Sequence, residues 1–541
     1  MVDNRKTYKI ITFGCQMNEH DSEVISGMLT QRGYMELPEN AVSGDAETGA
    51  AQADPDIIII NTCSIRDNAD QRFFGTLGQL KKIKARKPDF AVCVCGCMMQ
   101  QEHVTDRIRR SYPWVDVIFG THNIHEFPDM LEELYENRAK AAEAKAAHDR
   151  ETQPAAGAAA SSQPYARAKH EIRSAKETRV DRIYEDTKEI VEGLPAKRLF
   201  GHKSFVNIMF GCNNFCSYCI VPYTRGREKS RCPEDIVNEV RELVADGVKE
   251  VTLLGQNVNS YRGVCQKDGQ AWDFTDLIWA LADIDSLERI RFMTSHPKDL
   301  SDKLIDAFAR CDKLCNYIHL PVQAGSSEVL RQMNRKYTQE KYLDLVRKLR
   351  AAVPDIAIST DIIVGFPGET EEDFLQTLKL AEEVRYDSAF TFLYSPRPGT
   401  PAAEYEDQIP ENVKHERFGR LVETMNRISA EKNAAYVGRV CDVLVDGPDK
   451  KAKGRLSGRT EEFKLVDFEG PEEITGQIVK VEITGSNTFS LRGRLVLEAN
   501  CYEHQTDCQG SGGLGCHGIQ GVEPPGDSRA EDKRKDSEDH R

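Results

Sequence analysis

The feature that most constrains this chain of 541 residues is a loop with three closely spaced cysteines. Cys212, Cys216 and Cys219 have the spacing CxxxCxxC and follow the apolar run Phe205–Phe210, which is typical of a β-strand. Thiolates are soft ligands that suit iron–sulfur clusters, and a four-iron cluster usually takes four cysteines. Three thiols therefore predict a cluster with one iron open to another ligand. The alternatives are a zinc knuckle and a structural cluster whose fourth ligand lies far away in the sequence.

Composition and charge exclude several classes of protein. The formal net charge is −15, so the chain cannot coat nucleic acid uniformly and any RNA contact has to be local. No apolar run, Ile57–Ile60 included, approaches the length of a membrane span, and the first residues lack the core of a signal peptide. Sixteen cysteines are here more typical of metal ligands than of disulfides, so we expect a protein of the reducing cytoplasm.

Residues 6–138 repeat one pattern, in which a short apolar run ends in a polar turn and a helical stretch follows. The apolar runs are Tyr8–Phe13, Ile57–Ile60, Phe90–Cys95 and Val115–Phe119. Strands that alternate with helices predict an α/β domain with a doubly wound parallel sheet. In such sheets the ligand crevice lies beyond the carboxyl ends of the strands.

A second set of three cysteines falls at that predicted edge. Cys15, Cys63 and Cys97 each follow one of the first three apolar runs, so they are expected to converge although they are far apart in the sequence. Cys93 and Cys95 share a strand face with Cys97 by the period of two, and we interpret them as core residues because free cysteine packs as a small hydrophobe. This set is again one ligand short of a four-iron cluster.

Residues 198–433 alternate six apolar runs with helical stretches, which predicts a (β/α) barrel that stops at six units. The runs are Phe205–Phe210, Glu250–Leu254, Arg289–Met293, Tyr317–Leu320, Ala357–Val364 and Ala389–Tyr394. The turns after them are rich in Gly, Asn, Gln and Ser, which suit a nucleoside or amino-acid ligand. Because barrel chemistry lies on these turns, we expect the ligand site at that rim. We interpret His296 and His319 as structural residues.

Residues 436–496 contain several short strand patterns separated by turns, which predicts a small β-barrel of OB-like character. Within it, Lys450–Lys464 holds six basic residues against two acidic ones, which indicates a cationic loop that could contact an RNA backbone. A solvated charged loop is the alternative. The candidate RNA contacts are Lys450, Lys451, Lys453, Arg455 and Arg459.

Two stretches look like connections rather than domains. We interpret residues 139–197 as a linker or insertion, whose alanine-rich start is compatible with a helix as far as Arg150. Residues 497–541 are Gly-rich and then charged, and we expect them to be disordered. Cys501, Cys508 and Cys516 in this tail are spaced too loosely to favour a metal site.

Four motifs together resemble those of the methylthiotransferases, a family of radical S-adenosylmethionine (SAM) enzymes with a second cluster in an N-terminal domain and a C-terminal TRAM domain. The motifs are Thr12–Asn18, Asn61–Arg66, Cys95–Cys97 and Gly211–Cys219, and the resemblance covers about residues 6–496 apart from two insertions. It implies two 4Fe-4S clusters, of which one binds SAM at its open iron. The implied ligands are Cys212, Cys216 and Cys219 for the SAM cluster, Cys15, Cys63 and Cys97 for the auxiliary cluster, and Tyr218, Gln323 and Gly365 for SAM.

The stretches Ile220–Arg231 and Asn61–Ala69 resemble one branch of this family. That branch adds a methylthio group to N(6)-dimethylallyladenosine next to the tRNA anticodon, and it uses SAM both as the radical source and as the methyl donor. The resemblance therefore implies an anticodon stem-loop, an electron donor and a sulfur source as partners, and no membrane. The alternatives are a methylthiotransferase for threonylcarbamoyladenosine tRNA or for a ribosomal protein, and a non-catalytic iron–sulfur protein that binds RNA.

Overall fold

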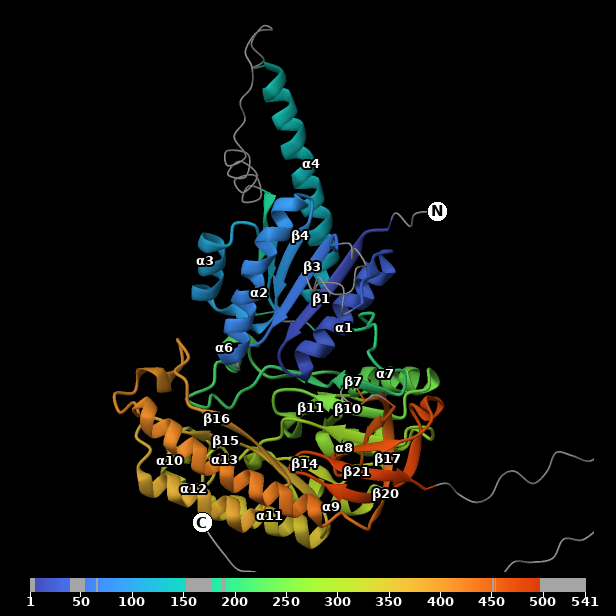
Figure 1. Cartoon of the computed structure of the whole chain (residues 1–541), viewed down its shortest axis with the longest axis vertical. Helices are drawn as coiled ribbons and strands as arrows, with labels where there is room; N and C mark the ends of the chain where they lie inside the picture. The colour runs from blue at the N-terminus through green and yellow to red at the C-terminus, as the bar shows by residue number, and fades with distance from the viewer. Residues whose placement is uncertain are drawn as a thin grey trace, which may run out of the picture. The chain divides into compact units, whose positions relative to one another are not determined.

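The computed structural model describes residues 5–38, 54–64, 67–151, 178–186, 190–449, 452 and 454–496 (Figure 1). The N-terminal part forms a six-stranded sheet with the order β2-β1-β3-β4-β5-β6, in which all neighbours are parallel. Its strands are β1 (Thr7–Phe13), β2 (Met35–Glu36), β3 (Ile57–Thr62), β4 (Ala91–Cys95), β5 (Val117–Phe119) and β6 (Val180–Arg182). The strand order reverses between β1 and β3, which makes their carboxyl ends the topological switch point of the sheet.

Helices cover both faces of this sheet, as a doubly wound fold requires. They are α1 (Gln16–Gln31), α2 (Asp67–Arg86), α3 (Glu102–Ser111) and α4 (Phe127–Glu151). Successive residues of β3 pack into the hydrophobic cores on opposite faces of the sheet. Ile57 and Ile59 pack with α1 and α4, whereas Ile58 and Ile60 pack with α2 and α3. The run of four isoleucines is therefore buried on both sides of the sheet, which confirms the predicted fold class.

The range expected to be a linker contributes to the sheet domain. Helix α4 continues as far as Glu151, in agreement with its alanine-rich sequence, and β6 adds a sixth strand at the edge. With only three residues, Val180–Arg182, β6 is too short to produce a recognisable alternation in the sequence. Its place is held instead by partners distant in the chain, such as the ion pair of Arg109 with Asp181 at 2.7 Å.

The central part is an incomplete barrel of two parallel three-stranded sheets, β13-β10-β7 and β14-β15-β16. A bridge between Ile290 and Leu314 joins them. The strands are β7 (Lys203–Asn207), β10 (Glu250–Leu254), β13 (Arg289–Phe292), β14 (Tyr317–His319), β15 (Ala357–Val364) and β16 (Ser388–Leu393). The longer helices are α7 (Pro233–Ala245), α8 (Phe274–Ala282), α9 (Asp302–Arg310), α10 (Ser327–Gln332), α11 (Gln339–Ala352), α12 (Glu371–Val384) and α13 (Glu411–Ala434).

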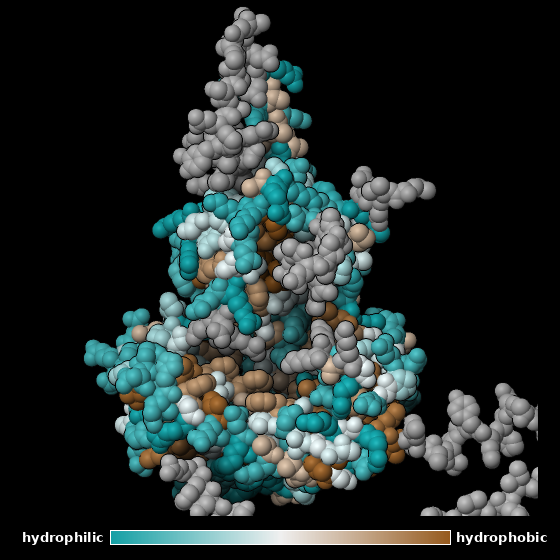
Figure 2. Space-filling model, in the orientation of Figure 1, coloured by the Kyte–Doolittle hydropathy of each residue, from teal (hydrophilic) through white to brown (hydrophobic). Residues whose placement is uncertain are grey.

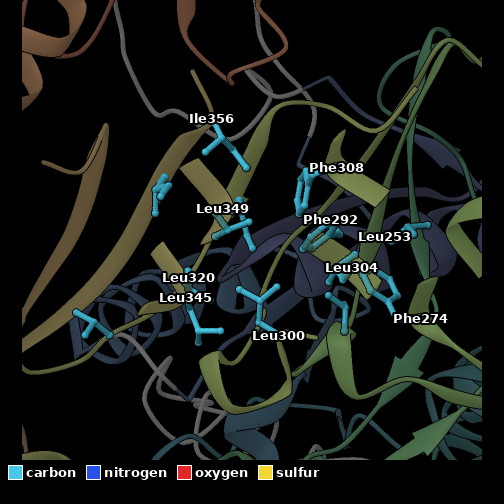
Figure 3. Packing of buried hydrophobic residues seen from close by; sticks show 14 of the residues in the cluster. Leu253, Phe274, Phe292, Leu300, Leu304, Phe308, Leu320, Leu345, Leu349 and Ile356 are labelled. Atoms are coloured by element: carbon cyan, nitrogen blue, oxygen red, sulfur yellow. The ribbon is translucent and has the colours of Figure 1, made fainter. Parts of the chain in front are cut away.

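The largest core of the molecule lies between these strands and helices. Leu253 and Phe292 from the strands pack with Phe274 and Phe308 from the helices, and all four are buried (Figure 3). Because successive side chains of a strand point to opposite faces, the residues that alternate with these core residues face the inside of the barrel. Tyr317, for example, packs there with residues of β7, β10 and the N-terminal domain.

Short elements connect the cysteine loop to the barrel. The strand β8 (Met209–Phe210) pairs antiparallel with β9 (Lys229–Ser230), and α6 (Val221–Thr224) lies between them. A second hairpin joins β11 (Arg262–Val264) to β12 (Ala271–Asp273).

Among the residues that the structure describes, no helix is long and apolar enough to cross a membrane. Hydrophilic residues dominate the visible surface over the barrel helices (Figure 2).

The C-terminal part is a closed five-stranded barrel with the order β17-β18-β19-β21-β20, which confirms the predicted small β-barrel. Its strands are β17 (Val440–Pro448), β18 (Leu456–Arg459), β19 (Leu465–Glu469), β20 (Ile478–Ser486) and β21 (Leu491–Leu495). The stretch Lys450–Lys464 is not wholly a loop as expected, because β18 lies inside it. This strand has one large apolar residue, Leu456, so its sequence lacks a strand pattern.

Two arginines of β13 attach the small barrel to the central one. The ring of Phe463 packs 4.9 Å from that of Tyr317, inside the central barrel, and Phe463 has a positive φ of 65°. Arg289 and Arg291 are 3% and 2% exposed and donate four hydrogen bonds of 2.6–3.0 Å to backbone carbonyls. The acceptors are Asp442, Arg459, Thr460 and Glu461.

Candidate functional site

The three cysteines of the N-terminal domain lie at the switch point of its sheet. Cys15 is the N-cap of α1 and lies two residues after β1, Cys63 follows β3, and Cys97 begins a short 3-10 helix after β4. Gly96 makes the last of these turns, because its φ is 99° and a Cβ would lie 2.3 Å from the carbonyl oxygen of Thr62. Neighbouring strand ends therefore present all three thiols to one place, as the sequence predicted.

The thiols interact with one another and with a cation. A hydrogen bond with Cys63 lowers the pKa of Cys15 to about 6, and the charge of Arg225 acts in the same direction. Arg225 Nε also donates to Cys97 Sγ over 2.9 Å. Burial raises the pKa of Cys97, and Arg225 counters it. Cys15 can therefore carry a thiolate near neutral pH, the form that binds metal.

Arg225 was not singled out in the sequence as a site residue, although it lies in one of the stretches that carry the family resemblance. It follows α6 of the central domain, is 7% exposed, and pairs with Asp21 of α1 at 3.0 Å. Burial alone would lower its pKa, but the charges of Cys97 and Asp21 outweigh burial and raise the pKa. A fixed cation from the barrel thus reaches the cysteines of the sheet domain.

Two buried asparagines hold the cysteine turns in register. Asn18 Nδ2 donates to Asn61 Oδ1 over 3.0 Å, and Asn61 Nδ2 donates back to the carbonyl oxygen of Asn18 over 2.8 Å. Asn61 also donates to Ser22 over 3.0 Å. Both amides are fully buried, and an asparagine at the end of the isoleucine run was the only sequence signal for this contact.

The cysteines of the central domain lie on a tight loop after β8. Gly211 starts it with a φ of 74°, and a Cβ there would lie 2.1 Å from the carbonyl oxygen of Arg227. Cys219 N donates to the carbonyl oxygen of Cys216 over 2.9 Å, which closes the turn. Burial, followed by the charge of Cys216, raises the pKa of Cys219 to about 12. Cys212 and Cys216 are buried and Cys219 is half-buried, so the loop gathers three thiols.

A second arginine supports this loop. Arg335 is 4% exposed, and its Nη1 lies 3.4 Å from Cys216 Sγ and 3.5 Å from the hydroxyl of Tyr218. It also donates to Pro321 O over 2.9 Å and to the Tyr337 hydroxyl over 3.1 Å. Each cysteine set therefore has one buried arginine, and neither was assigned from the sequence.

The predicted SAM contacts lie on the barrel rim next to the cysteine loop. Tyr218 is within the loop, Gln323 follows β14, and Gly365 follows β15. Gln323 has a φ of 72° and donates its backbone N–H to the carbonyl oxygen of Asp361 over 2.8 Å. Gly365 has a φ of 76° and would place a Cβ 2.4 Å from Lys414 Cγ. The structure brings all three to one end of the barrel.

The donor chemistry of both cysteine sets fits an iron–sulfur cluster. Among the described residues, no three or more His, Cys, Asp or Glu side chains are arranged to hold a single metal ion. The thiolates of a multi-iron cluster bind different irons, so they need not be arranged around one ion. All six cysteines are free thiols, so they remain available as ligands.

The candidate RNA contacts are only partly described. Lys450, Lys451 and Lys453 lie outside the described residues, as do Cys501, Cys508 and Cys516 of the tail. Arg455 Nη2 donates to the carbonyl oxygen of Asp467 over 2.9 Å. Arg459 lies over the ring of Phe463, with 4.2 Å between its Cζ and the ring centroid, so it faces the junction of the two barrels.

Comparison with known families assigns the three parts of the chain. Residues 206–381 match the radical SAM superfamily, residues 7–120 match the uncharacterized protein family UPF0004, and residues 434–496 match the TRAM domain. A solved structure of the radical S-adenosylmethionine methyltransferase TsrM from Kitasatospora setae, with cobalamin and a 4Fe-4S cluster bound, aligns with a TM-score of 0.47 and 15% identity. That alignment covers 74% of this chain and 77% of the other.

Curated relatives match almost the whole chain. The tRNA-2-methylthio-N(6)-dimethylallyladenosine synthase of Clostridioides difficile is 49% identical over 493 residues, which cover 91% of this chain and 92% of the relative. The protein of the same name from Alkaliphilus oremlandii is 48% identical over 493 residues and is covered to 93%. With this identity along nearly its full length, the chain belongs to the family of tRNA-2-methylthio-N(6)-dimethylallyladenosine synthases.

Proposed function

We propose that this protein converts N(6)-dimethylallyladenosine next to the tRNA anticodon to its 2-methylthio derivative, with SAM and two 4Fe-4S clusters. The observation that carries the proposal is the pair of three-cysteine sets, each of which is one thiol short of a complete four-iron site within the described part of the chain. The names of the relatives support the substrate. A protein that only bound RNA would have no use for two incomplete sites.

In this proposal Cys212, Cys216 and Cys219 hold the SAM cluster, and Cys15, Cys63 and Cys97 hold the auxiliary cluster. When bound, such clusters would pass on the electron that cleaves SAM and hold the sulfur that is inserted, chemistry beyond the reach of acid–base side chains. The chain's own residues orient these parts. The buried guanidinium of Arg335 holds the SAM loop, and that of Arg225 balances the negative charge of the auxiliary thiolates.

The proposed contacts with SAM and tRNA follow from where the residues lie in the fold. Tyr218, Gln323 and Gly365 would bind SAM at the barrel rim, where glycine and exposed amides allow close approach to a nucleoside. The TRAM domain would hold the tRNA backbone through Lys450, Lys451, Lys453 and Arg455. A tRNA substrate implies that the enzyme acts in the cytoplasm with an electron donor and a sulfur source.

Anaerobic reconstitution tests the proposal. Incubation with SAM, a reductant and an anticodon stem-loop that carries N(6)-dimethylallyladenosine should release 5′-deoxyadenosine and add a methylthio group to the RNA, as measured by mass spectrometry. A variant in which Cys212, Cys216 and Cys219 are all alanine should keep the second cluster, seen as residual iron and sulfide, but cleave no SAM. Modification of a ribosomal protein instead of the RNA would contradict the proposed substrate.

A further inference from the structure

The inner wall of the central barrel carries an aromatic side chain that is open to solvent. Phe390 of β16 is 49% exposed. It is paired in register with Asp361 of β15, so the two side chains lie on the same face. The neighbouring Ala389 packs against the core under the helices, which places Phe390 on the opposite, inner face.

A hydrogen-bonded row of polar residues fixes the wall next to this ring. His319 meets Phe390 edge-on, with 6.0 Å between the ring centroids. Its Nδ1 lies 2.8 Å from Ser359 Oγ, which in turn lies 2.6 Å from the hydroxyl of Tyr317. Its Nε2 faces Asp361 Oδ1 at 3.5 Å. Hydrogen bonds thus fix His319 in the wall, where it supports an aromatic surface with polar groups along one edge.

This wall adjoins an apolar cluster that reaches the neighbourhood of both cysteine sets. Tyr317 belongs to an interior apolar cluster with Met17, and Cys15 of the auxiliary set packs against the same cluster. Phe210, which directly precedes the SAM-cluster loop, packs there as well.

We infer that Phe390 is the stacking platform for the target adenine, with the His319–Asp361 pair along the polar edge of the base. A half-exposed ring on the inner wall of a barrel leaves apolar surface for a base to stack on, and every nucleobase has a π-face for such a contact. A base has to leave its own stack to reach an enclosed site, and an aromatic side chain replaces the lost contacts. This inference rests on the proposed RNA substrate and adds the residue that positions its base.

Binding and base stacking can be measured without turnover. The probe is an anticodon stem-loop with 2-aminopurine, a fluorescent adenine analogue that is quenched by stacking, at the target position. It is titrated with the anaerobically reconstituted wild type, Phe390→Ala and Phe390→Tyr. Leu375→Ala is the matched control, because Leu375 is 41% exposed but lies on α12 outside the barrel.

Loss of the ring should weaken stem-loop binding about 5- to 150-fold, the range expected for one base–aromatic stack. Phe390→Ala should also raise the emission of the bound probe, whereas Phe390→Tyr and Leu375→Ala should behave as the wild type. Cleavage of SAM without RNA should be the same in all four proteins. Thermal unfolding of Phe390→Ala should be close to wild type, because the side chain is half exposed.

Two results would overturn the inference while the proposed function stands. One is that the wild type modifies the natural stem-loop while Phe390→Ala binds the probe and quenches its fluorescence as well as the wild type does. The other is loss of RNA-independent SAM cleavage in Phe390→Ala, which would place this ring in the SAM site. A wild type that neither binds nor modifies the stem-loop would instead refute the proposed function, and this inference with it.

Discussion

Substitution of Gly96 by alanine should remove the auxiliary cluster while the SAM cluster stays. Gly96 turns the chain from β4 to Cys97 with a φ of 99° and a ψ of −175°, a combination that is essentially restricted to glycine. An added Cβ would lie 2.3 Å from the carbonyl oxygen and 2.8 Å from the amide nitrogen of Thr62, next to Cys63. Neither is the end of a flexible side chain, so the backbone of both cysteine turns has to move.

These contacts set the free energy by which Gly96→Ala should destabilise the fold. The strained backbone costs about 1–3 kcal/mol, and overpacking against backbone atoms costs about 1–3 kcal/mol more, or about 2–6 kcal/mol together. The same substitution at Gly78 is the control. That residue lies within α2, an added Cβ would meet nothing within 4 Å, and alanine should stabilise the helix by up to about 1 kcal/mol.

Iron and sulfide analysis of the reconstituted proteins gives the answer. Wild type and Gly78→Ala should each bind about eight irons per chain, and Gly96→Ala should bind about four. The four that remain should still support reductive cleavage of SAM. If Gly96→Ala kept a full complement of iron and unfolded at the wild-type temperature, the close approach of the two cysteine turns would be refuted.

Three further substitutions test other parts of the site. Cys15→Ala should keep SAM cleavage and lose methylthio transfer, and equal loss of both would contradict separate roles for the two clusters. Arg225→Met leaves the buried carboxylate of Asp21 unpaired and should destabilise the apo-protein by about 3–5 kcal/mol. The double variant with Asp21→Asn should regain part of the lost stability, as measured by thermal unfolding. Burial raises the pKa of Glu369 to about 7 from 4.5, although Arg417 opposes the shift. The protonated acid therefore stabilises the fold fully below pH 4.5, and this contribution is lost as the pH rises through 7. Glu369→Gln should make the free energy of unfolding less dependent on pH between these values. An unchanged slope of that free energy against pH would contradict the raised pKa.

Local patterns in the sequence predicted the cysteine sets and the strands that carry them. An apolar run that ends in glycine and cysteine has few ways to fold, and β10 and β15 have the predicted bounds. The convergence of Cys15, Cys63 and Cys97 followed from a general property of parallel sheets, whose carboxyl ends lie together whatever the loops between them contain. Such features repeat along the chain or depend on neighbouring residues, so a single sequence records them.

Contacts between distant segments were decided only by the tertiary structure. Arg225 reaches Cys97 across 128 positions of the chain, and Arg335 reaches Cys216 across 119. An arginine in a sequence does not show whether its guanidinium faces water or a buried thiol. Likewise, the pattern of β16 shows that Phe390 alternates with its neighbours, but only the assembled barrel leaves that ring open beside His319. Burial and charge compensation are properties of the packed molecule, because they arise where segments that never meet in the sequence are brought together.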